Sequence, residues 1–90
     1  MGRVVNELAA RTVLIVEDEW LVRMELATAF EDEEFTVLEG ASAEDALAVL
    51  HAGQHGGARV DLLVTDIRLN GMLSGWDLAA HARAFDSSIA

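Results

Sequence analysis

The sequence contains no cysteine, so it offers neither a disulfide framework nor a thiolate metal site. It also lacks any apolar run of the roughly 18 residues that a membrane-spanning helix needs. The first ten residues, MGRVVNELAA, contain one arginine and no continuous apolar stretch, which is unlike a secretory signal. These absences predict a cytoplasmic protein that does not contact the membrane.

Lysine is absent as well, so all of the positively charged side chains are arginines. Six arginines stand against sixteen aspartates and glutamates, and the formal net charge is −10. Proteins that bind nucleic acid are normally basic or carry a basic stripe. Neither feature is present in this sequence, and we therefore do not expect a nucleic acid as a partner.

Three short runs have the composition of strands in a parallel sheet. Thr12–Val16 and Val60–Thr65 are mostly apolar, which is the pattern of a strand that is covered on both faces. Phe35–Glu39 is a further short strand between them. Ninety residues suffice for one small domain, which we place at residues 12–90. Residues 1–11 are predicted to be a tail or a helical lead-in.

Helical patterns alternate with these strands. Trp20–Glu31 has two apolar stripes, which predicts a helix covered on more than one side, with Arg23 facing solvent. The two stripes are Leu21, Met24, Ala27 and Phe30, and then Val22, Leu26 and Ala29. Ser42, with Asp45 three residues later, is a typical N-cap of a second helix. Trp76–Phe85 is the third predicted helix.

Strand and helix alternate three times, which is typical of an α/β fold with a parallel sheet and right-handed crossovers. In such sheets ligands bind beyond the carboxyl ends of the strands, where the strand order reverses. If the first strand lies between the second and the third, the order is 2-1-3. Glu17 and Asp18, which follow the first strand, then converge with Asp66, which follows the third.

Three carboxylates without cysteine or histidine make an oxygen-only site, which suits a hard cation such as Mg²⁺. A bound cation would also offset the repulsion among three like charges. The alternative is that Glu17, Asp18 and Glu19 simply form an acidic helix N-terminus, where each carboxylate gains about 0.3–1 kcal/mol from the helix dipole. Asp66, which comes from a different strand, favours the metal site.

The segments VLIVEDE, DLLVTDIRL and GWDLA, in this order, resemble the receiver domain of two-component response regulators. The resemblance covers about residues 12–86. It implies a flavodoxin-like fold and a phosphoryl-accepting aspartate. Asp66 matches the phosphoryl acceptor, and Glu17 and Asp18 match the acidic pair that binds Mg²⁺. The backbone carbonyl of Arg68 matches a further metal ligand. The implied partner is a histidine kinase or a phosphotransfer protein.

The sequence departs from the receiver pattern in several places. Asn70 stands where the family usually has proline, and Gly75 lies one residue later than usual. The family continues with two more strand-helix units, which supply a switch serine or threonine and a lysine that pairs with the phosphoryl group. No lysine is present, and Ser87 and Ser88 come too early to match the switch hydroxyl. We therefore expect a truncated receiver fold, with residues 12–90 as a partial receiver domain.

Two functions follow from this comparison of motifs. The first is a phosphorelay receiver that accepts a phosphoryl group on Asp66 with Mg²⁺. The second is a receiver-derived interaction or dimerisation module without productive phosphorylation. We expect a homodimer, because the third strand becomes an edge of the sheet and can pair with another chain. A phosphotransferase enzyme is disfavoured, because Arg68 occupies the position of a second acid after Asp66. We therefore do not expect an enzyme.

Overall fold

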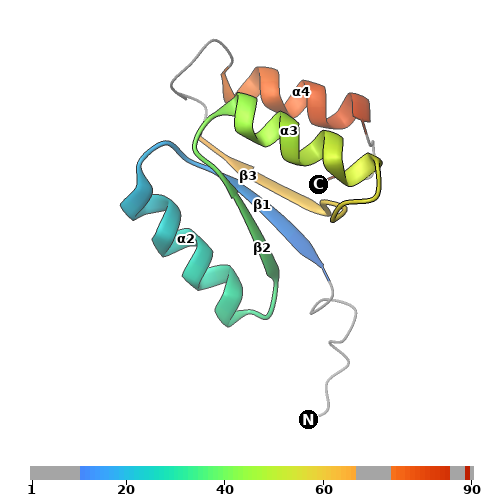
Figure 1. Cartoon of the computed structure of the whole chain (residues 1–90). Coiled ribbons are helices and arrows are strands. Elements are labelled where there is room, and N and C mark those ends of the chain that lie inside the picture. Colours follow the sequence, from blue (N-terminus) through green and yellow to red (C-terminus); the bar gives the residue numbers. More distant parts are fainter. Residues whose placement is uncertain (1–10, 67–73, 86–88, 90) are drawn as a thin grey trace.

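The computed structural model describes residues 11–66, 74–85 and 89. Strands and helices alternate along this part of the chain (Figure 1). The elements are β1 (Thr12–Val16), α2 (Trp20–Asp32), β2 (Thr36–Gly40), α3 (Ala43–Gln54), β3 (Leu62–Thr65) and α4 (Gly75–Phe85). The predicted lead-in lies outside the described residues except for Arg11, and so do Arg68, Asn70, Ser87 and Ser88.

The three strands form one parallel sheet in the order β2-β1-β3, as the sequence predicts. Val13 of β1 lies opposite Val37 of β2 and Leu62 of β3. The Asp61 carboxylate, which immediately precedes β3, accepts a hydrogen bond of 2.8 Å from the backbone N–H of Thr12. The strand order and this register place the carboxyl ends of β1 and β3 side by side.

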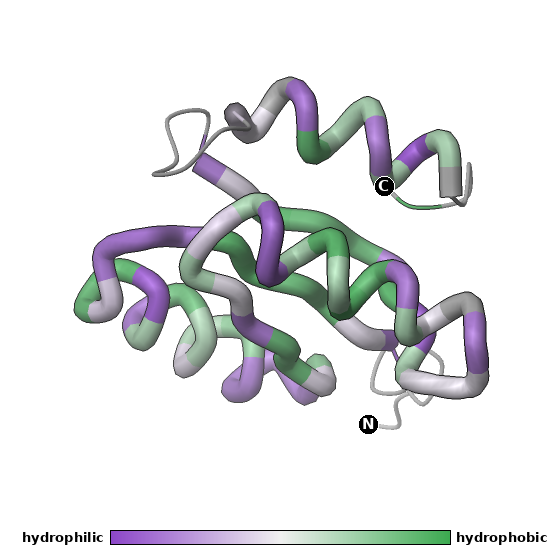
Figure 2. The backbone as a smooth tube through the Cα atoms, turned by 45° about the horizontal axis from the view of Figure 1, so that its top comes forward, coloured by the Kyte–Doolittle hydropathy of each residue, from purple (hydrophilic) through white to green (hydrophobic). Residues whose placement is uncertain are grey.

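Helices cover both faces of the sheet. Helices α3 and α4 lie on one face and α2 lies on the other (Figure 1). Because side chains alternate along a strand, β1 contributes to both cores. Leu14 and Val16 pack in the cluster that α3 and α4 cover, and Val13 and Ile15 pack in the cluster that α2 covers. Figure 2 shows β1 as an almost continuous apolar segment within the sheet.

The buried face of α2 differs from both predicted stripes. Ala27 is buried, and Leu26 and Phe30 are half-buried against the sheet. Leu21 is 58% exposed and Met24 is 47% exposed, so the prediction that they face the core is wrong. A single helix on this face turns only one side toward the sheet, and the helical period places residues 23, 26, 27 and 30 on that side.

The ends of the helices follow known capping rules. The Ser42 hydroxyl accepts a hydrogen bond of 3.1 Å from the N–H of Asp45, which confirms the predicted N-cap of α3. Helix α2 ends in a Schellman motif, in which the N–H groups of Glu34 and Phe35 donate to the carbonyls of Glu31 and Phe30. Glu34 lies in the left-handed region, with φ of 70°.

None of the described helices has both the length and the apolar character needed to cross a membrane.

Candidate metal and phosphoryl site

Three acidic side chains meet at the carboxyl ends of β1 and β3. Glu17 and Asp18 directly follow β1, and Asp66 directly follows β3. One carboxylate oxygen from each of the three lies within 4.8 Å of the others. The predicted convergence of these residues is therefore present, although the sequence places Asp66 almost fifty residues after Asp18.

The backbone and carboxylate of Glu17 are held from three directions. Its N–H donates to the carbonyl of Gly40 over 3.1 Å, and its own carbonyl accepts from Nη1 of Arg23 over 2.6 Å. Its Oε2 accepts from the N–H of Glu19 over 2.9 Å. Glu17 is also buried, with 8% of its surface exposed. These contacts fix the innermost acid of the site.

Asp66 lies at the open side of the site. Its N–H donates to the carbonyl of Val16 over 3.3 Å, which continues the pairing of β3 with β1 by one residue. The Thr65 hydroxyl donates to the Asp66 carbonyl over 2.9 Å. Asp66 is exposed and Asp18 is half-buried. The depth of the acids therefore increases from Asp66 through Asp18 to Glu17.

The surroundings of Glu17 raise its pKa above the ordinary value of 4.5. The hydrogen bond from the N–H of Glu19 favours the carboxylate and lowers the pKa. Burial, a side-chain hydrogen bond with Asp18 and the negative charges of Asp66 and Asp18 act in the opposite direction and outweigh it. The three acids therefore repel one another in the absence of a cation.

Arg23 lies beside the acids, and the prediction that it faces solvent is wrong. Its side chain is only 20% exposed, and its Nε donates to Oε1 of Glu39 over 3.2 Å. Side chains on a helix lean toward its N-terminus, so an arginine in the first turn of α2 reaches back to the end of β1. The spacing of six residues between Glu17 and Arg23 is the sequence feature that could have indicated the contact between the Arg23 guanidinium and the Glu17 carbonyl.

The donor set suits a hard divalent cation. All three groups are carboxylates, and their oxygens are close enough together to share one ion. Oxygen ligands combined with water favour Mg²⁺ over metals that prefer nitrogen or sulfur. Glu17, Asp18 and Asp66 therefore fit the predicted Mg²⁺ site. Arg68, whose carbonyl was predicted as a further ligand, lies outside the described residues.

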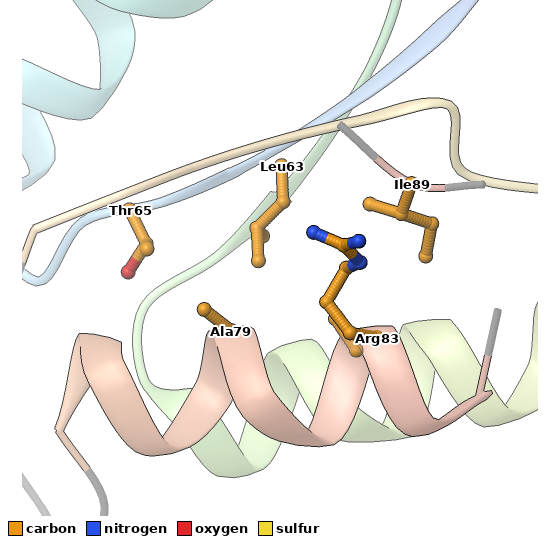
Figure 3. A pocket seen from close by; sticks show the side chains of 6 residues that line it. Leu63, Thr65, Ala79, Arg83 and Ile89 are labelled. Carbon is orange, nitrogen blue, oxygen red and sulfur yellow. The ribbon is translucent and has the colours of Figure 1, made fainter. Parts of the chain in front are cut away.

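A separate groove of about 170 Å³ lies between β3 and α4 (Figure 3). The side chains of Leu63 and Thr65 point from β3 toward the helix, and Arg83 rises from α4 toward Leu63 and Ile89. Leu63 is half-buried against the core cluster that also contains Ile89. None of the described residues that line the groove is acidic, and none of them belongs to the carboxylate site.

Comparison with protein families gives one match that spans most of the chain. Residues 13–90 match the model of the response regulator receiver domain. No curated protein matches the chain.

Solved structures of receiver domains are also similar. The receiver domain of the hybrid histidine kinase CckA has 32% sequence identity and a TM-score of 0.69, over 86% of this chain and 68% of that one. A response regulator receiver protein from Sinorhizobium medicae WSM419 has 32% identity and a TM-score of 0.79, over 89% of this chain and 61% of that one. TrrA from Thermotoga maritima, solved in complex with Mg²⁺–BeF, has 26% identity and a TM-score of 0.75, over 86% of this chain and 62% of that one. The chain thus spans about two thirds or less of the length of these structures.

Proposed function

The chain belongs to the response regulator receiver domain family, and we propose that Asp66 accepts a phosphoryl group while Glu17, Asp18 and Asp66 hold Mg²⁺. The observation that carries this proposal is the approach of the three carboxylates to within 4.8 Å at the ends of two neighbouring strands. Asp66 matches the family's acceptor, and it is the exposed member of the group. A phosphodonor can therefore reach it from solvent.

The proposed reaction is a phosphoryl transfer from a phosphohistidine to a carboxylate. A carboxylate oxygen of Asp66 forms the new bond to phosphorus, and the bond from phosphorus to the histidine nitrogen breaks. Mg²⁺, when bound, supplies positive charge that offsets the charge on the phosphoryl oxygens. Glu17 and Asp18 would hold the ion at the end of β1, and the Arg68 carbonyl is a further proposed ligand. The histidine belongs to a histidine kinase or a phosphotransfer protein, in the cytoplasm.

The complex of TrrA with Mg²⁺–BeF supports the choice of cation, since that receiver has the same fold. The acidic residues of the present chain match the family pattern at both strand ends. The chain is therefore proposed to act as a signalling phospho-acceptor and not as an enzyme with a separate substrate.

A second function, an interaction or dimerisation module without productive phosphorylation, has support of its own. Within the described part of the chain, β3 pairs only with β1 and lies at the edge of the sheet. Helix α2 exposes apolar residues: Trp20, Leu21 and Met24 are 60%, 58% and 47% exposed. Exposed apolar surface and a strand edge both favour association.

Intact-mass measurement after incubation with a small acyl phosphate and Mg²⁺ distinguishes the two functions. We expect a phosphate adduct on the native chain, and its loss in Asp66→Asn and in the presence of EDTA. Glu25→Gln, which removes a charge from the exposed surface of α2, is the matched control and should be labelled like the native chain. Absence of any adduct on a folded native chain that binds Mg²⁺ would favour the interaction module.

A further inference from the structure

Arg23 joins three parts of the chain beside the carboxylate site. It lies in the first turn of α2, where its own N–H donates to the carbonyl of Glu19 over 2.9 Å. Its Nη1 donates to the carbonyl of Glu17 over 2.6 Å, and its Nε donates to the Glu39 carboxylate of β2 over 3.2 Å. The guanidinium therefore links the residue that follows β1 to β2 and to α2.

The carbonyl that Arg23 holds belongs to the peptide group between Glu17 and Asp18. A peptide group is planar, so fixing its oxygen also fixes where the Cα of Asp18 lies. The preceding peptide group is fixed as well, because the Glu17 N–H donates to the Gly40 carbonyl over 3.1 Å. The backbone is thus restrained on both sides of Glu17. Repulsion between the acids tends to move them apart, and this restraint opposes that movement.

The geometry requires a guanidinium and not merely a positive charge. Arginine donates from three nitrogens at fixed positions in one plane, whereas the donors of lysine share one nitrogen. Arg23 uses two of these nitrogens, with Nε on Glu39 and Nη1 on Glu17. Lysine at this position would keep the charge but could not form both hydrogen bonds in the same directions.

We propose that Arg23 is a positioning residue, which sets the Mg²⁺ affinity of the carboxylate site by holding the Glu17–Asp18 peptide group between α2 and the Glu39 carboxylate. This inference rests on the proposed Mg²⁺ site. A positive charge beside a cation site weakens cation binding by repulsion, so a purely electrostatic role predicts that removing Arg23 tightens Mg²⁺ binding. A positioning role predicts that removing Arg23 weakens it.

Calorimetric titration of Mg²⁺ into the native chain, Arg23→Lys and Arg23→Gln tests the proposal. We expect both variants to bind Mg²⁺ about tenfold more weakly, which is the lower end of the roughly 10–100-fold loss that follows removal of a residue that orients metal ligands. Arg83→Gln, on the exposed surface of α4, removes one positive charge away from the acids and should bind like the native chain. Urea unfolding without Mg²⁺ measures the structural effect of each variant separately. If Arg23→Gln does not fold, Arg23→Lys alone decides.

The outcomes separate this proposal from the proposed function. Native-like Mg²⁺ affinity in folded Arg23→Lys overturns the positioning role, even if its urea midpoint falls, because Arg23 then contributes to stability alone. Tighter binding in Arg23→Gln with native affinity in Arg23→Lys also overturns it, since charge is then the whole effect. In both cases the native chain still binds Mg²⁺ and the proposed function stands. A native chain that binds no Mg²⁺ refutes the proposed function and the role of Arg23 together.

Discussion

Replacing Asp66 with asparagine should stabilise the chain in the absence of Mg²⁺ and abolish the stabilisation that Mg²⁺ provides. Asparagine has nearly the same shape as aspartate but no charge. It therefore removes the repulsion between Asp66 and the two acids that follow β1, Glu17 and Asp18. It also removes one of the three carboxylates that we propose as Mg²⁺ ligands. The two effects have opposite signs, so a single substitution tests both the repulsion and the role of Asp66 as a ligand.

The separation of the carboxylates gives the magnitude. Two unit charges 4.8 Å apart repel by about 0.9 kcal/mol at the dielectric constant of water and by about 3.5 kcal/mol at an effective value of 20. Asp66 is exposed, so the lower figure applies to each of its two pairs, and salt reduces it further. We expect the free energy of unfolding of Asp66→Asn to exceed that of the native chain by about 1–2 kcal/mol without Mg²⁺.

Urea unfolding at pH 8, followed by circular dichroism, measures this difference with EDTA and with saturating Mg²⁺. Mg²⁺ should raise the midpoint of the native chain by mass action and leave Asp66→Asn almost unchanged. Glu25→Gln changes the net charge by the same one unit on the exposed surface of α2, so it controls for the total charge of the chain. Destabilisation of Asp66→Asn in EDTA would contradict the repulsion between Asp66 and the other two acids, and a full Mg²⁺ response in that variant would contradict the role of Asp66 as a ligand.

Three further substitutions test other features of the structure. Folding raises the pKa of Glu17 above 4.5, so just above this pH the Glu17 carboxyl is still partly protonated in the folded chain but largely ionised in the unfolded chain. The free energy of unfolding should therefore fall as pH rises above 4.5. Glu17→Gln should reduce this slope in Mg²⁺-free urea titrations, and an unchanged slope would contradict the assignment. Glu34 has a φ of 70°, a backbone conformation that favours glycine. Glu34→Gly should therefore raise the free energy of unfolding by about 1 kcal/mol, as measured by urea unfolding, and a loss of stability would contradict this prediction. The exposed apolar side chains of α2 and the edge of β3 should allow self-association at micromolar concentration, which Leu21→Glu should weaken if α2 forms the contact. Light scattering that shows only a 9.7 kDa native monomer would contradict this prediction.

The secondary-structure elements and the convergence of the three acids could be predicted before the fold was known. Hydrophobic patterns located all three strands and all three described helices, with boundaries shifted by one or two residues at several ends. Given the strand order 2-1-3, the carboxyl ends of neighbouring parallel strands bring Asp66 beside Glu17 and Asp18, which the structure shows. This worked because the pattern of a buried strand and the crossover rule depend on local composition and on chirality, and both can be derived from the sequence.

The buried face of α2 and the contacts of Arg23 could not be predicted in this way, because both depend on how the helix packs against the sheet. Both apolar stripes of α2 were plausible core faces, and the side that meets the sheet depends on how the helix packs over β1 and β2. The same packing brings Arg23 between the Glu17 carbonyl and the Glu39 carboxylate, which belong to different elements. Helical periodicity specifies which residues share a face, but the direction of that face is fixed by contacts between segments that are distant in the sequence.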